Sequence, residues 1–169
     1  MRECLPSDTE IMPRTSPLET ERGNIAALLR DWPPRAIEAV IEECLRLWKA
    51  EDLASRLQWR WNPRLRTTIG RALLEEGMME LNPLLLGRHP EEMRPVVVHE
   101  LAHLVVTARH GLRVAPHGAE WKALMRLSGE STRATHDLNV DGLRAAPRRR
   151  ARGRRRRGVR VIWRRAKKS

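Results

Sequence analysis

An almost unbroken apolar segment, residues 96–106, carries two histidines and one glutamate in its middle. A helix over this segment has apolar residues on nearly every side, which is typical of a helix buried in the core of its domain. The polar side chains of His99, Glu100 and His103 are costly to bury there without a partner. The segment therefore predicts a central helix with a polar site in it, and a domain folded around that helix.

The three polar residues have the spacing of a metal site. His99 and His103 are four residues apart, and Glu100 directly follows the first histidine. Residues four apart lie on one face of a helix, so both imidazoles can reach a single Zn²⁺ while Glu100 lies to the side. Zinc makes a bound water acidic, and a carboxylate beside it can take the proton as the water attacks a carbonyl group. The pattern predicts zinc-dependent hydrolysis of peptide bonds. The alternative is a buried structural helix whose histidines have other partners.

A catalytic zinc usually has three protein ligands, so one more ligand has to come from outside this helix. The candidates are His110, His117, Glu120 and His136. The metzincin pattern is excluded, because it needs glycine at position 106 and histidine at position 109, where this chain has Val106 and Arg109.

His117 is the ligand that we expect, since it lies beyond the turn at Gly111 and a chain reversal can bring it back over the metal. Glu120 is the second candidate, as a carboxylate ligand of the thermolysin type. His136 is a candidate for an outer group beside the ligands, or for a solvated side chain.

The flanking sequence predicts an α+β fold with helices packed on a short, mainly antiparallel sheet. Helical spacing of apolar residues predicts helices over 18–32, 35–50 and 118–127. Alternating residues over 57–61, a turn at Asn62 and Pro63, and the segment 65–74 predict a hairpin, and a third strand is predicted over 78–81. The central helix ends at Gly111, whereas its start is open, because Pro95 would break a helix that is already under way.

Charge divides the chain into a near-neutral body and a basic tail. The 169 residues include 33 Lys or Arg and 21 Asp or Glu, a net charge of +12. Residues 144–169 hold 14 of the basic residues and no acid, which leaves 19 basic and 21 acidic residues, a net −2, in residues 1–143. We predict a flexible N-terminus over 1–17, one domain over 18–143 and a disordered basic tail over 144–169.

Other features exclude several classes of protein. No apolar run approaches the roughly 20 residues of a membrane span, and the N-terminus lacks the pattern of a signal peptide. The two cysteines, Cys4 and Cys44, form no paired metal-binding motif. These observations predict a cytoplasmic protein that has no membrane partner, and a basic tail of this kind is compatible with association with the nucleoid.

Taken together, the motifs resemble a known family. They are His99-Glu100-x-x-His103, then Val114-Ala115-Pro116-His117-Gly118-x-Glu120-Trp121-Lys122, then Arg133-Ala134-Thr135-His136, with Gly70 and Met79-Glu80-Leu81-Asn82 upstream. This arrangement is similar to that of the SprT family of zinc metalloprotease-like proteins, over about residues 35–140. The resemblance implies a minimal zincin-like fold, one Zn²⁺ per chain bound by His99, His103 and His117, and Glu100 as the general base.

The same resemblance bears on partners. Eukaryotic members of the family, of the Spartan type, degrade proteins that are crosslinked to DNA, so the resemblance implies a peptidase acting on proteins, including proteins on DNA. We further expect the strand that ends at Asn82 to pair with an extended peptide and hold it across the zinc. The alternative function is a zinc-containing nucleic-acid-binding or stress-related protein without proteolytic activity.

The tail is where the chain departs from that family. Many relatives carry a C-terminal zinc ribbon with two cysteine pairs, whereas residues 144–169 contain no cysteine. One interpretation is a phosphate-binding segment that holds the domain on nucleic acid without reading its sequence. The others are a solvated terminus without a partner, and the product of a degraded or shifted reading frame.

Overall fold

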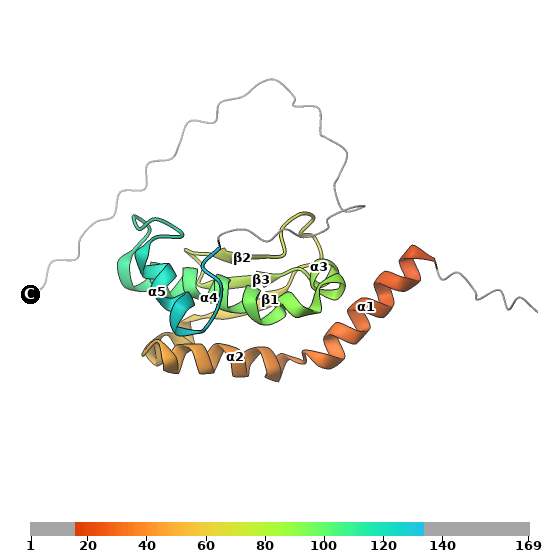
Figure 1. The fold of residues 1–169 in the computed structure, drawn as a ribbon, viewed down its shortest axis with the longest axis horizontal. Coiled ribbons are helices and arrows are strands. Elements are labelled where there is room, and N and C mark those ends of the chain that lie inside the picture. Colours follow the sequence, from red (N-terminus) through yellow and green to blue (C-terminus); the bar gives the residue numbers. More distant parts are fainter. Residues whose placement is uncertain (1–15, 134–169) are drawn as a thin grey trace, which may run out of the picture.

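The computed structural model describes residues 16–133. The predictions for the N-terminal segment, for the basic tail and for His136 fall mostly or wholly outside these residues. Within them, the fold class is α+β, as the sequence predicted: helices pack against a three-stranded sheet (Figure 1). None of the helices over 16–133 combines the length and the apolarity that crossing a membrane requires.

Two helices begin the fold. Helix α1 (Pro17–Asp31) starts at Ser16, whose side chain accepts a hydrogen bond from the Glu19 amide while the Glu19 carboxylate accepts one from Ser16 in return. Helix α2 (Pro34–Leu47) follows directly, because the proline pair at 33 and 34 ends one helix and starts the next. Both helices agree with the prediction to within a few residues, and Figure 1 shows α1 at the edge of the molecule beside α3.

The sheet has a different strand order from the predicted one. A short 3₁₀ helix, η1 (Glu51–Arg56), leads into β1 (Gln58–Trp61), which is followed by β2 (Gly70–Leu73) and β3 (Met78–Leu81). The order across the sheet is β1-β3-β2, with β1 parallel and β2 antiparallel to β3. The predicted hairpin between β1 and β2 is therefore wrong: β2 forms its hairpin with β3, and one of the two strand pairs in the sheet is parallel.

The physical reason lies in Asn82 and Glu80. The Asn82 side-chain amide donates to the carbonyls of Leu65 and Thr68, and this fixes the loop between β1 and β2 against the end of β3. Glu80 accepts hydrogen bonds from Arg60 on β1 and from Arg71 on β2, so it ties both outer strands to the central one. Alternating apolar residues identify β1 as a strand but contain no information about its neighbour.

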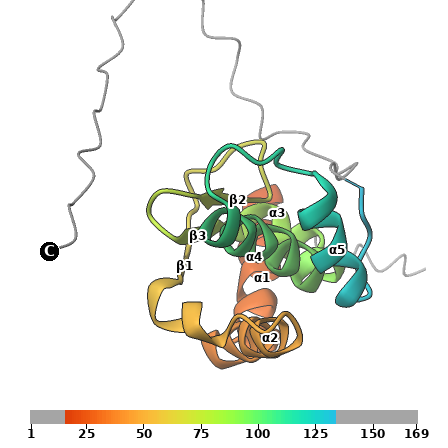
Figure 2. The same cartoon turned by 90° about the vertical axis from the view of Figure 1, so that its left-hand side faces the viewer.

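The central helix is α4 (Met93–His110). It begins two residues before Pro95, so this proline lies in the first turn, where a backbone N–H has no partner within the helix. Figure 2 shows α4 in the middle of the molecule, between the strands, α2 and α5 (Ala119–Leu127), in agreement with its contacts with β2, β3, α2 and α5. The short helices α3 (Pro83–Arg88) and η2 (Pro90–Glu92) connect the sheet to α4. The predicted burial of α4 is confirmed, since Val97, Leu101 and Val105 are at most 1% exposed.

Candidate metal centre

Three histidine side chains converge at one point beside α4. The Nε2 atoms of His99 and His103 are 3.2 Å apart, those of His103 and His117 are 3.2 Å apart, and those of His117 and His99 are 3.3 Å apart. Among residues 16–133, these three are the group of His, Cys, Asp or Glu side chains whose ligand atoms lie close enough to hold one metal ion. The structure thus brings together the three residues that the sequence singled out as metal ligands.

Local backbone geometry places each histidine. His99 and His103 lie one helical turn apart on α4, and therefore on the same face. The helix stops at Gly111, whose φ of 79° is in the left-handed region that favours glycine. A loop then leads back, and His117 comes just before Gly118, the residue that precedes the first turn of α5. Reversal of the chain after α4, expected from the sequence, is what brings His117 to the helix.

The spacing of the three nitrogens fits a tetrahedral metal ion. Nitrogen ligands about 2.0–2.1 Å from a tetrahedral Zn²⁺ lie about 3.3–3.4 Å from each other. The observed separations of 3.2, 3.2 and 3.3 Å are close to this value, so the imidazoles need almost no rearrangement to bind such an ion. Three neutral nitrogen ligands on one side of the ion leave a fourth position for water or substrate.

Trp121 supports all three imidazoles. It is fully buried, and its indole N–H donates a hydrogen bond of 3.3 Å to the backbone carbonyl of His99. Its ring lies 4.8 Å from the ring of His99, 5.6 Å from that of His103 and 4.7 Å from that of His117, centroid to centroid. The ring of His103 also donates to the backbone carbonyl of Pro116, and since its Nε2 faces the other histidines, Nδ1 is the donor. These contacts fix the rotation of the rings before a metal binds.

The surroundings of His103 and His117 favour the neutral form of the imidazole, which is the form that binds metals. Burial, together with the nearby His117, lowers the pKa of His103 to about 4, against a smaller effect of the Pro116 hydrogen bond. The pKa of His117 is lowered by burial and by the charge of Lys122. Neutral imidazoles offer a lone pair without first losing a proton, so the protonation state of these two residues suits a metal at neutral pH.

Glu100 lies on the side of α4 that faces the sheet. It is 9% exposed, and burial raises the pKa of its carboxyl group to about 7, although a hydrogen bond from the backbone of Ala72 acts in the opposite direction. Gly70, also on β2, packs against the same side chain: a β-carbon at position 70 would lie 3.2 Å from Glu100 Cγ. Strand β2 therefore holds the carboxylate in place. A carboxyl group with a pKa near neutrality can both accept and return a proton.

The other candidate ligands are not part of the cluster. Glu120 is exposed on the first turn of α5, and His110 is exposed at the last residue of α4. Neither belongs to the group of ligand atoms found among the described residues. His136 lies beyond them, at a position that the structure does not describe.

Two features of the centre were not predicted from the sequence. Trp121 was recognised as an apolar residue of α5 and as part of a motif, but its spacing did not reveal that one ring contacts three histidines. The contact of β2 with Glu100 was not foreseen either. A glycine inside a predicted strand indicates a close approach of another group, and Gly70, within the predicted segment 65–74, carried that signal.

The fold and the site together define an α+β protein with a three-histidine candidate metal centre on its central helix. A family model described as the SprT-like family matches residues 37–141, which is more than half of the chain. The chain belongs to the SprT-like family, so the resemblance noted in its motifs is confirmed.

Individual relatives agree with this assignment. The chain is 46% identical over 80 residues to Protein SprT of Klebsiella pneumoniae (strain 342), covering 46% of this chain and 48% of that protein. It is 45% identical over 80 residues to Protein SprT of Shigella boydii serotype 18 and of Escherichia coli (strain K12 / DH10B), with the same coverage. The chain thus matches about half the length of these curated relatives. No solved structure matches it.

Proposed function

We propose that this protein is a zinc-dependent metallopeptidase in which His99, His103 and His117 bind one Zn²⁺ per chain and Glu100 is the general base. The observation that carries the proposal is the convergence of three Nε2 atoms within 3.3 Å of each other, with Glu100 buried at the next position of the same helix. Membership of the SprT-like family supports a hydrolase of the metallopeptidase type.

Zinc, when bound, supplies Lewis-acid chemistry that makes water more acidic and polarises a substrate carbonyl. The chain's own residues supply the proton transfers. Glu100 accepts a proton as the water attacks the peptide carbon, and it returns the proton to the leaving nitrogen, so that one C–N bond is broken and one C–O bond is formed. Its buried position excludes bulk water, and the amide of Ala72 orients the carboxylate for this exchange.

The strand that presents the peptide is β2 and not β3. The hypothesis that the strand ending at Asn82 pairs with the substrate is wrong, because β3 is paired on both sides. In an antiparallel pair, alternate residues direct their backbone groups toward the partner strand. The carbonyl of Ile69 accepts from Asn82 at the end of β3, so the backbone groups of Gly70 and Ala72 face away from β3, on the side of Glu100. We propose that an extended peptide pairs with this outer edge of β2.

Substituting Glu100 provides the test of the proposed function. In the zinc-loaded protein, Glu100→Gln keeps the shape of the side chain but removes the base, so we expect cleavage of an unfolded test protein to fall at least 100-fold with about one Zn²⁺ per chain retained. Glu120→Gln is the matched control, an exposed glutamate near the site, and should keep both zinc and activity. Cleavage that persists in Glu100→Gln, or zinc that is lost in Glu120→Gln, would contradict the assigned roles.

A second function, binding to nucleic acid, is favoured by the distribution of charge. Residues 144–169 carry 14 basic side chains and no acidic one, a composition suited to contacts with phosphates through release of counterions. We propose that this segment holds the domain on DNA in the cytoplasm, and that proteins on DNA are among its substrates. Deletion of 144–169 should abolish most of the salt-dependent affinity for a DNA duplex, measured by anisotropy at two or more salt concentrations. Unchanged affinity after the deletion would exclude this role of the tail.

A further inference from the structure

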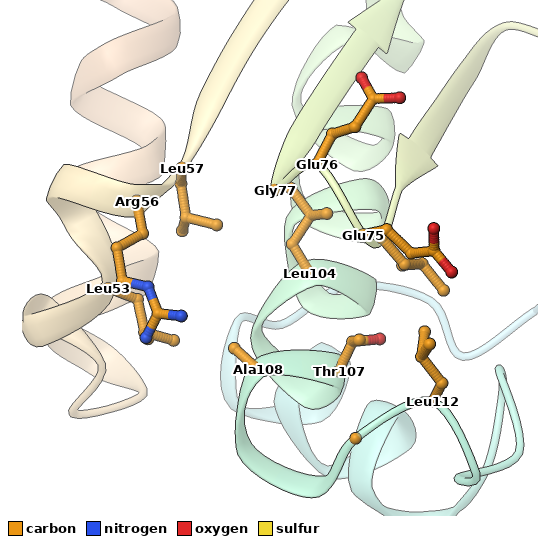
Figure 3. Close-up of a pocket in the computed structure, with 12 residues that line it drawn as sticks. Leu53, Arg56, Leu57, Glu75, Glu76, Gly77, Leu104, Thr107, Ala108 and Leu112 are labelled. Carbon is orange, nitrogen blue, oxygen red and sulfur yellow. The ribbon is translucent and has the colours of Figure 1, made fainter. Parts of the chain in front are cut away.

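A pocket of about 690 Å³ lies between the sheet and the C-terminal half of α4. Its apolar lining comes from Leu53, Leu57, Leu74, Leu104, Ala108 and Leu112, and we call it the leucine pocket. Figure 3 shows Leu53 and Leu57 on one wall, Leu112 toward the opposite one, and Ala108 and Thr107 on α4 between them. None of the three histidines lines the pocket, so it is a separate site from the metal centre.

The leucine pocket is nevertheless adjacent to the metal centre. Thr107, part of its lining, is one helical turn beyond His103 on the same face of α4, which is about 6 Å along the helix axis. Two other residues that line the pocket belong to segments that also border the metal centre. Leu74 directly follows β2, and Leu112 begins the loop that carries His117. A peptide that pairs with β2 across the metal centre therefore passes the mouth of the pocket.

The pocket leaves apolar surface in contact with water. Leu74 is 37% exposed and Leu112 is 59% exposed, whereas most large apolar side chains of the domain are buried. Covering them with an apolar group would lower the free energy in proportion to the apolar area that is removed from water. The volume is in the range of about 300–1,000 Å³ that is typical of ligand pockets, so it accommodates a bulky side chain, aromatic ones included.

Strand direction decides which part of a peptide reaches the pocket. Antiparallel pairing is the more stable arrangement for an added strand, and a peptide antiparallel to β2 has its amino-terminal side at the end of β2 where Leu74 lies. If Glu100 is the general base, as proposed, then Ala72, whose backbone is hydrogen-bonded to Glu100, lies beside the bond to be cleaved. Leu74 is two residues further along the chain, so the peptide side chain opposite it belongs about two residues before that bond.

We infer that the leucine pocket is a specificity site, which binds a bulky apolar side chain of the substrate about two residues on the amino side of the cleaved bond. The inference rests on the proposed peptidase function. The rim of the pocket adds a further preference: Glu75 and Glu76 lie on it with Arg56 alone opposing them, so acidic side chains are disfavoured there.

Cleavage-site mapping tests this inference. The zinc-loaded full chain is incubated with an unfolded test protein, and the cleaved bonds are identified by mass spectrometry. We expect Leu, Met or aromatic residues to be enriched about two residues on the amino side of the cleaved bond. A peptide with leucine at that position should be cleaved about 10- to 100-fold faster than its serine counterpart. Absence of any enrichment, or enrichment on the carboxyl side, would overturn the inference.

Two substitutions remove the pocket without touching the metal centre. Ala108→Phe fills it, and Leu112→Ser removes one apolar wall; both positions are exposed, so the fold should tolerate them. Each should reduce the preference for leucine over serine to near unity while zinc content and cleavage of the serine peptide stay unchanged. The matched control is Ala39→Phe, at an exposed position of α2 that does not line the pocket. A preference that survives in Ala108→Phe would overturn the inference.

Peptide binding separates this inference from the proposed function. The probe is a labelled peptide of Gly, Ser and Thr with one leucine, compared with the same peptide without leucine, and binding is measured to the zinc-loaded Glu100→Gln protein. Tighter binding of the leucine peptide that is lost on adding Ala108→Phe supports the pocket whether or not the wild-type protein cleaves. If the wild type cleaves nothing, the proposed function fails; if both peptides bind equally, the inference fails.

Discussion

Gly70 on β2 lies against the side chain of Glu100 on α4 so closely that the two positions constrain each other. A β-carbon at position 70 would be 2.6 Å from Val96 Cγ1 and 3.2 Å from Glu100 Cγ, and the first of these distances is too short for two carbon atoms that are not bonded to each other. Space for the carboxylate therefore depends on the absence of a side chain in the neighbouring strand.

Gly70→Ala should accordingly displace Glu100 and lower the rate of peptide cleavage by about 10- to 100-fold, since a shift of about 1 Å at a reacting group has effects of this size. Zinc content should remain near one per chain, because no histidine atom is among the nearest neighbours of a β-carbon at position 70. Gly23→Ala is the control: a β-carbon there has no atom within 4 Å, and alanine favours the helix. Full activity in Gly70→Ala would show that the carboxylate is not held by this contact.

The contacts of Trp121 predict an effect on metal affinity. Trp121→Phe removes the hydrogen bond to the His99 carbonyl and part of the ring surface beneath the imidazoles, so we expect zinc affinity to fall about 10-fold. Competition with a chelator measures this change. Trp48→Phe is a close match, because Trp48 is also buried and its indole N–H also donates to a backbone carbonyl, that of Leu124. It should lower the free energy of unfolding by about 1–3 kcal/mol but leave zinc affinity unchanged; equal zinc affinities in the two variants would contradict the role of Trp121.

Metal binding should stabilise the fold, because the three histidines converge in the folded chain and can bind the ion there. At a free Zn²⁺ concentration 100 times the Kd, the free energy of unfolding rises by about 2.7 kcal/mol, and the thermal midpoint rises with it. Calorimetry with and without a chelator gives both values. His117→Ala should lose most of this increase, whereas His110→Ala, at an exposed histidine outside the cluster, should keep it. A Tm that does not depend on zinc would contradict the candidate metal centre itself.

Glu80 predicts how stability depends on pH. Burial tends to raise the pKa of its carboxyl group, but hydrogen bonds from Arg60, Asn62 and Arg71 outweigh burial and lower the pKa to about 2. Because the pKa is lower in the folded than in the unfolded chain, this group stabilises the fold fully above about pH 4.3, and the contribution is lost as the pH falls toward 2.

The measurement is urea unfolding over this pH range. We expect Glu80→Gln to be less stable than the wild type at neutral pH by about 1–3 kcal/mol, with the difference shrinking as the pH approaches the folded pKa. Glu38→Gln, at an exposed position of α2, should unfold like the wild type at every pH. A difference between Glu80→Gln and the wild type that is constant across the range would mean that the ion pairs are not its origin.

Periodicity was sufficient to predict the helices and insufficient to predict the sheet. The apolar spacing of α2 and of α4 locates them to within a few residues, because a helix is formed by contacts local in sequence. Strand β1 was recognised, but its neighbour was assigned by proximity along the chain, whereas the pairing depends on Glu80 reaching both Arg60 and Arg71. Such long-range polar contacts leave no periodic signal.

The candidate site was more predictable than the sheet because metal ligands restrict the choice of residues. Two histidines one turn apart on a helix fix the face on which a metal would bind. A third ligand then has to come from a segment that reverses direction and returns to that face, as the segment of His117 does. What surrounds the ligands was less accessible. The contact of Trp121 with three rings, and the edge of β2 beside Glu100, depend on how two elements pack, which spacing within either element does not reveal.

The position of β3 between two strands that precede it has a consequence for synthesis of the chain on the ribosome. β2 and β3 can form their hairpin as soon as both have emerged, but within residues 16–133 β1 pairs with β3 alone, and Gln58 pairs with Met78, twenty positions later. Until then the tryptophans of β1, Trp59 and Trp61, have no completed sheet to pack with. A nascent chain that stalls before residue 78 therefore exposes an unpaired aromatic strand, the kind of segment that chaperones bind and that aggregates when it is not protected.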